Sequence, residues 1–105
     1  MSKFVVRKLN MDLIGISHNK IKNGDSVEFE KAFKKYYAPL CHFAAGILKE
    51  YDSAEEIVQD LFCTYWNKRE TIEIETSLKS YLYQATKNRC LKFITHKKVV
   101  EKHEK

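Results

Sequence analysis

Apolar residues recur at intervals of three and four positions in three stretches of the chain, the spacing of one face of an α-helix. The first stretch spans residues 26–49, the second runs from about Ser53 to Lys68, and the third from Leu78 to about Lys98 or beyond. Their apolar stripes contain, in order, Phe29, Phe33, Tyr36, Tyr37, Leu40, Phe43, Ala44, Ile47 and Leu48; then Ala54, Ile57, Val58, Leu61, Phe62 and Tyr65, with Trp66 at the border; then Leu78, Leu82, Ala85, Thr86, Cys90, Phe93 and Ile94. The sequence therefore predicts three amphipathic helices.

Polar residues that cap helices precede each stretch. Asp25, followed three positions later by Glu28, fits a capping box. Asp52 and Ser53 are suitable N-caps for the second helix, and Ser77 for the third. These residues predict where the helices begin.

Pro39 lies in the middle of the first stretch and predicts a kink or a break near residues 36–38. Residues 69–76 alternate polar and β-branched side chains, which in isolation fits a short strand. Because no second strand is available to pair with it, we expect an extended loop. The predicted fold class is all-α: a small three-helix bundle with a first helix kinked near Pro39.

The ends of the chain differ from its middle. Residues 1–24 carry no sustained helical stripe, and residues 19–24 have the composition of a linker or loop. We therefore expect a weakly structured appendage at 1–24 and a helical domain at 25–98. Residues 99–105 are mostly charged and are expected to be a frayed basic tail or the start of a linker.

The composition limits the class of protein. A chain of 105 residues with 44% hydrophobic residues forms one domain with a single core. No apolar run approaches the roughly 18–20 residues needed to span a bilayer, so we expect no membrane insertion. Three widely separated cysteines favour reduced thiols and a cytoplasmic location.

The charge is unevenly distributed along the chain. The total is +5, but residues 51–76 carry −5 and residues 77–105 carry +6. A basic surface favours phosphates and an acidic one repels them, so this asymmetry indicates two different partners. The alternative is that both are ordinary solvated surfaces.

The residue types needed for catalysis or metal binding do not form recognisable motifs. The four histidines do not pair with cysteines at zinc-finger spacing, and the chain contains no C-x-x-C motif. The three glycines are isolated, which excludes a phosphate-binding glycine loop. We therefore expect no metal, no cofactor and no enzymatic activity.

Three segments, in their order along the chain, resemble region two of bacterial sigma factors of the extracytoplasmic-function (ECF) group. The opening helix of that region is similar to residues 29–40 (FEKAFKKYYAPL). Its second conserved helix is similar to residues 52–66 (DSAEEIVQDLFCTYW). Its promoter-reading helix is similar to residues 78–91 (LKSYLYQATKNRCL), continuing to residues 96–98. The resemblance covers about residues 26–98.

This resemblance implies a dissociable subunit of bacterial RNA polymerase that directs the enzyme to promoters. The second helix of such proteins docks on the β′ clamp helices of the polymerase core. Glu56, Gln59 and Asp60 match the docking motif, with Glu55 beside it. Their spacing of i, i+3 and i+4 places the three on one helical face, although compensation of the helix dipole also explains Glu55 and Glu56.

The resemblance also implies that the third helix binds the −10 promoter element and the melted nontemplate strand, aiding strand opening. Melted bases need stacking surfaces, and the strand needs cations along its backbone. Candidates on this helix are Lys79, Lys87, Arg89 and Lys92 for phosphates, Tyr81 and Tyr83 for stacking, and Asn88 for a polar contact. Tyr81 has an alternative role in the core, and Tyr83 lies further from the apolar stripe.

A loop that captures a flipped base precedes this helix in the family. Here the loop corresponds to Glu70, Thr71, Ile72, Glu73, Ile74, Glu75, Thr76 and Ser77. Glu73 and Glu75 repel phosphate, so we expect the loop to read a base only through carefully placed contacts.

Two further expectations follow from the comparison with the family. Family members continue into a second helical domain that reads the −35 element, and this sequence ends at Lys105. We therefore expect the chain alone not to recognise a complete promoter. An anti-sigma factor is a further candidate partner, and the alternative function is a helical interaction or regulatory domain that binds proteins without melting promoters.

Overall fold

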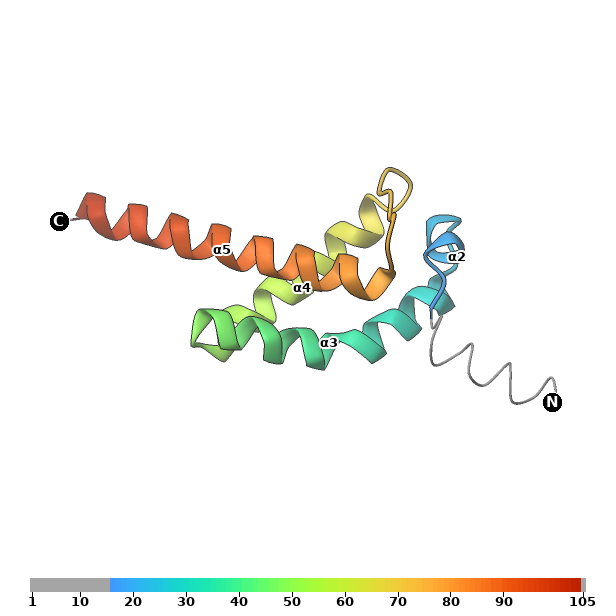
Figure 1. Ribbon diagram of the computed structural model, residues 1–105, viewed down its shortest axis with the longest axis horizontal. Coiled ribbons are helices and arrows are strands. Elements are labelled where there is room, and N and C mark those ends of the chain that lie inside the picture. The colour runs from blue at the N-terminus through green and yellow to red at the C-terminus, as the bar shows by residue number, and fades with distance from the viewer. Residues whose placement is uncertain (1–15, 105) are drawn as a thin grey trace.

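The structure is a computed structural model that describes the backbone of residues 16–104 and the side chains of residues 16–98. This part of the chain contains helices α2 (His18–Lys22), α3 (Ser26–Leu48), α4 (Tyr51–Asn67) and α5 (Leu78–Glu104), and no strand. Figure 1 shows α4 returning alongside α3, and α5 running back across α4. The predicted all-α fold is confirmed, with the short helix α2 added to the three long ones. No described helix has both the length and the apolar character needed to cross a membrane.

The start of α3 carries half of the predicted capping box. The Asp25 carboxylate accepts a hydrogen bond of 3.0 Å from the backbone N–H of Glu28. The Glu28 carboxylate does not return to Asp25 but accepts a bond of 2.9 Å from the backbone N–H of Ser17. The Asp25 N–H donates instead to the carbonyl of Lys20, at 3.0 Å. The second half of the box is thus replaced by contacts to the segment that contains α2.

α3 continues through Pro39 without the expected break. Proline removes one backbone donor, which leaves the carbonyl of Lys35 without its usual helical partner. Both residues are exposed, so water can satisfy that carbonyl and the helix continues. A kink at Pro39 stays a prediction.

The turn between α3 and α4 makes α4 begin earlier than predicted. Lys49 adopts a left-handed conformation with φ of 63°, and its N–H donates to the carbonyl of Ala45 at 2.7 Å. The chain is then placed so that Glu50 caps α4, accepting from the backbone N–H of Ser53 at 3.3 Å and from its hydroxyl at 2.7 Å. The predicted caps Asp52 and Ser53 therefore lie within the first turn.

α5 begins where predicted and continues further. The Ser77 hydroxyl accepts from the backbone N–H of Ser80 at 3.1 Å, which confirms the predicted cap. The backbone is helical to Glu104, and the expected fraying after Lys98 stays a prediction.

The core lies between α3, α4 and α5, with one side chain from α2. The stripes of α4 and α5 agree with the sequence prediction, and that of α3 agrees except at Phe33, because its buried side also includes Ala32 and Cys41. Ala32 and Cys41 are fully buried, whereas Phe33 is 36% exposed. The fully and nearly fully buried apolar residues are Ile21, Ala32, Tyr36, Leu40, Cys41, Ala44, Ala54, Val58, Leu61, Phe62, Tyr65, Leu78, Leu82 and Cys90.

Residues 16–24 correct the expectation of a weakly structured appendage. Ser17 caps α2, and Ile21 is fully buried against the bundle. Gly24 makes the turn into α3 with φ of 96°, a conformation that residues other than glycine rarely adopt. The expectation for residues 1–15 lies outside the described residues.

Candidate functional site

The acidic residues of α4 divide between two sides of that helix. On the side toward α3, Gln59 donates from Nε2 to the hydroxyl of Tyr37 at 3.1 Å, and that hydroxyl donates to Glu55 at a long 3.5 Å. On the other side, Glu56 and Asp60 line a groove shared with α5. The predicted docking residues therefore lie on one helix but face two neighbouring elements.

The groove between α4 and α5 joins the two predicted contact surfaces. Asp60 accepts from Nη1 of Arg89 at 2.7 Å, and their side chains are 70% and 30% exposed. Lys92 and His96 continue the α5 wall of this groove, which has a volume of about 660 Å³. A residue predicted to bind polymerase thus pairs with one predicted to bind DNA.

The remaining basic candidates on α5 are free of this pairing. Lys79, Lys87 and Lys92 are exposed, and none forms an ion pair with another described side chain. Asn88 is exposed and accepts from Nε2 of Gln84 at 3.0 Å. These lysines are available to neutralise an external polyanion.

The two tyrosines of α5 have different surroundings. The ring of Tyr83 packs edge-on against Phe43 of α3, with centroids 5.1 Å apart. Tyr81 is half-buried near Tyr65, at a centroid distance of 6.0 Å, and burial raises the pKa of its phenol. Although Tyr83 lies further from the apolar stripe, Tyr81 is the one that borders a pocket.

That pocket lies between the predicted base-capturing loop and the first turns of α5. Its volume is about 450 Å³. Its lining residues are Glu73, Ile74, Glu75, Thr76, Ser80, Tyr81 and Gln84. The structure therefore brings loop residues 73–76 together with the predicted promoter-reading helix. Asn88 does not line the pocket. It lies one helical turn after Gln84, which does line it, and it accepts a hydrogen bond from that side chain.

Contacts from α2 hold this loop, and sequence reasoning missed them. Nε2 of His18 lies 3.1 Å from the carbonyl oxygen of Ile72, and its Nδ1 lies 2.7 Å from the hydroxyl of Tyr65. Lys22 pairs with Glu73 at 3.2 Å. The only sequence signal for α2 is Ser17 as a cap, because these partners are about fifty positions away along the chain.

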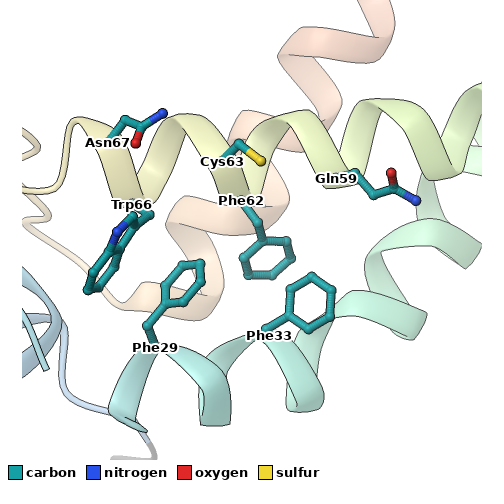
Figure 2. Close-up of a pocket in the computed structure, with 7 residues that line it drawn as sticks. All are labelled: Phe29, Phe33, Gln59, Phe62, Cys63, Trp66 and Asn67. Carbon is teal, nitrogen blue, oxygen red and sulfur yellow. The ribbon is translucent and has the colours of Figure 1, made fainter. Parts of the chain in front are cut away.

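An apolar groove lies on the opposite side of α4, facing α3. Figure 2 shows Phe29 and Phe33 of α3 directed toward Phe62 and Trp66 of α4. Gln59, Cys63 and Asn67 complete the lining of this groove of about 360 Å³. Phe29, Phe33 and Phe62 belong to the predicted apolar stripes, and Trp66 borders one of them. Their rings pack together, with centroids 4.9 Å apart for Phe29 and Trp66.

Comparison with protein-family models matches residues 32–99 to the family described as Sigma-70 region 2. The chain belongs to this family. No curated protein and no solved structure matches the sequence. As a sigma-70 region 2 domain, the chain has a role in transcription initiation, through promoter recognition and RNA polymerase binding.

The limits of the region 2 match are informative about the site. The match contains α4, the loop and most of α3, and it follows α5 to Val99. α2 and the first residues of α3 lie before it. The helix that holds the candidate loop is therefore outside the part of the chain that matches the family.

Among the described residues, no group of three or more His, Cys, Asp or Glu side chains is arranged to hold a metal ion. The candidate site is instead a set of surfaces: a pocket beside a loop, exposed lysines, and acidic groups on the neighbouring helix.

Proposed function

We propose that this chain is the region-2 module of an ECF-type sigma factor, which binds the −10 promoter element and the β′ clamp helices of RNA polymerase. In this proposal, residues 25–98 form the functional domain and residues 99–105 lead toward a linker. α2 is attached to this domain by Ile21, which is fully buried.

The observation that carries the DNA-binding part is the pocket of about 450 Å³ at the junction of the loop and α5. A base flipped from the melted strand needs a concave surface that provides both a stacking platform and polar groups. The ring of Tyr81 supplies the surface, and the Ser80 hydroxyl and Gln84 amide supply polar groups. The remaining loop residues, 70–72 and 77, support the pocket from outside.

The strand itself is bound by the basic side of α5. Lys79, Lys87 and Lys92 neutralise phosphates, and Asn88 contacts a nucleotide at the edge of the pocket. Arg89 takes a smaller part, because Asp60 already occupies its guanidinium. Tyr83 contributes through the exposed part of its ring, beyond its contact with Phe43.

Polymerase docking uses the outer surface of α4. Glu56 and Asp60 present carboxylates to basic residues of a partner helix, while Gln59 and Glu55 are positioned through Tyr37. Charge complementarity of this kind accelerates association and selects the partner.

A forked DNA probe with a single-stranded −10 region, bound by the chain with polymerase core, tests the DNA contacts. We expect Lys87→Glu and Asn88→Ala to weaken binding and promoter opening, while Lys20→Glu, which changes an exposed lysine of α2 that has no ion pair with a described side chain, serves as the matched charge control. Unchanged binding by the first two variants would remove α5 from the site.

Docking is tested separately by capture on immobilised β′ clamp helices. Gln59→Ala combined with Asp60→Lys should reduce capture, while the circular dichroism spectrum stays that of the folded chain. Capture equal to that of the unmodified chain would exclude this face of α4.

A second candidate function, a helical domain that binds only proteins, is favoured by the groove between α3 and α4. Its lining is mostly aromatic, and Gln59 lies at its edge. An anti-sigma factor is the partner that this reading implies. The forked DNA experiment distinguishes the two functions, because a protein-only domain binds the probe no better than a duplex without a −10 sequence.

A further inference from the structure

The loop that borders the candidate base pocket is fixed from two directions. At its α5 end, Ser77 caps the helix. At its other end, the Ile72 N–H and Thr71 hydroxyl bond to the carbonyl of Lys68, and α2 supplies the contacts beyond this turn. The pocket wall begins at Glu73, immediately after the residue that His18 contacts.

The tautomer of a neutral His18 ring follows from its two partners. The carbonyl of Ile72 can only accept, so Nε2 of His18 carries a proton and donates to it. In the neutral ring Nδ1 is then an acceptor, and the hydroxyl of Tyr65 donates to it. Tyr65 is fully buried, and burial raises the pKa of its phenol, which keeps the hydroxyl protonated as a donor. His18 thus links a buried core residue to the loop backbone.

Lys22 offsets a negative charge on the loop side of the pocket. Its ammonium group pairs with Glu73 at 3.2 Å, one residue after the backbone that His18 holds. The pair offsets one of the two carboxylates that line the pocket and directs it toward α2. The other, Glu75, has no ion pair among the described side chains.

We propose that α2 is a positioning element for the base pocket: His18 and Lys22 hold residues 72–73 so that the pocket accepts a base with an exocyclic amino group. The chemical class follows from the lining, because carboxylates accept hydrogen bonds from the exocyclic amino groups that cytosine, adenine and guanine carry. Thymine has no amino group, and its single donor, N3–H, is flanked by two carbonyl oxygens that repel a carboxylate. This inference rests on the proposed function, because it concerns how the proposed pocket selects its base.

The helix α2 lies before the residues matched to the family, whereas its partners Tyr65, Ile72 and Glu73 lie within them. The anchoring of α2 itself is firm, through the buried Ile21 and the bond from the Ser17 N–H to Glu28. A change in His18 or Lys22 therefore affects the loop without removing α2 from the bundle.

The test uses the full chain with polymerase core and forked DNA probes that differ only in the base at each single-stranded −10 position. We expect one position at which adenine or cytosine is preferred to thymine. His18→Ala should reduce this preference about fivefold, the factor that one hydrogen bond of ordinary net strength provides. Lys22→Ala removes an ion pair whose Glu73 side chain is 80% exposed, so its effect should be smaller, about 1.5- to threefold. His18→Gln should recover part of it, because its amide N–H lies near the position of Nε2.

The matched control is Lys20→Ala, which removes the same charge from the same helix. The Lys20 side chain is exposed and makes no hydrogen bond or ion pair with the described residues. If Lys20→Ala reduced the base preference as much as Lys22→Ala does, the proposal would be overturned, because the effect would reflect net charge alone. So would an unchanged preference in both His18→Ala and Lys22→Ala.

Amide hydrogen exchange of residues 70–77, measured without DNA, separates this inference from the proposed function. Exchange that is about fivefold faster in His18→Ala and faster by a smaller factor in Lys22→Ala, but unchanged in Lys20→Ala, supports positioning by α2 even if no probe binds. Unchanged exchange in all three variants overturns it. Failure of the unmodified chain to bind any probe would instead refute the DNA-binding function.

Discussion

Salt dependence of DNA binding distinguishes the basic residues of α5, because one of them already has an intramolecular partner. Arg89 pairs with Asp60 at 2.7 Å, whereas Lys87 is exposed and has no described ion pair. The perturbation is the substitution of each by alanine, and the measured quantity is the slope of log affinity against log salt for a single-stranded −10 oligonucleotide.

The expected size follows from counterion release. Each phosphate neutralised on a single strand contributes about 0.7 to the magnitude of the slope. Between about 50 and about 200 mM salt, a fourfold range, one such contact changes the relative affinity roughly 2.6-fold. Lys87→Ala should therefore reduce the slope by about 0.7. Arg89→Ala should change it by less than about half of that, because Asp60 competes with the phosphate for the same guanidinium.

Asp60→Asn provides the reciprocal measurement. It keeps the size of the side chain but removes its charge, so Arg89 becomes available and the slope should grow by up to about 0.7. In that background, Arg89→Ala should then reverse the gain. The assay is fluorescence anisotropy with the chain alone, which avoids the proposed role of Asp60 in polymerase docking.

The reasoning is refuted if Arg89→Ala flattens the slope as much as Lys87→Ala does in the unmodified chain. It is equally refuted if Asp60→Asn leaves the slope unchanged. Either result would mean that the ion pair does not restrict Arg89. The Asp60 side chain is 70% exposed, and surface ion pairs contribute little net energy.

Three further predictions concern stability and reactivity. Tyr65→Phe removes the hydroxyl that donates to His18, and urea unfolding should show a loss of about 0.5–1.5 kcal/mol, whereas a loss of zero would mean that the bond makes no net contribution. Leu82→Ala empties a fully buried site and should cost about 2–5 kcal/mol in the same assay; a cost under about 1 kcal/mol would contradict close packing there. Of the three thiols, only that of Cys63 should react rapidly with a disulfide reagent at mildly alkaline pH. Burial shields the thiols of Cys41 and Cys90 and raises their pKa. Rapid reaction of all three thiols in the folded chain would show that the core opens readily.

The sequence predicted the long helices because their information is local. The stripe of α4 fixes which side is buried, and Ser77 signals the start of α5 through a contact only three residues away. The wrong prediction of where α4 begins also has a local cause. Two good caps, Asp52 and Ser53, follow Glu50, and the tight turn at Lys49 selects Glu50.

The site required information that the sequence does not carry locally. α2 has one buried apolar residue, Ile21, so no periodic stripe reveals it, and His18 finds its partners only after the chain has folded. The pairing of Asp60 with Arg89 joins two helices that the charge pattern assigned to separate partners. Each surface could be predicted alone, but their contact depends on how α5 crosses α4.

The length of α5 has a geometric consequence. Among the side chains that the structure describes, up to residue 98, the last partly buried ones are Phe93 and Ile94. The backbone stays helical to Glu104, and Figure 1 shows this end projecting past the turn between α3 and α4. A helix advances about 1.5 Å and turns about 100° per residue. The candidate base pocket at its first turns and any group held at its far end therefore lie on one continuous helix, which fixes both their separation and their relative rotation about the helix axis. Insertion of a single residue between them would swing that group by more than a quarter of a turn while moving it hardly at all along the axis.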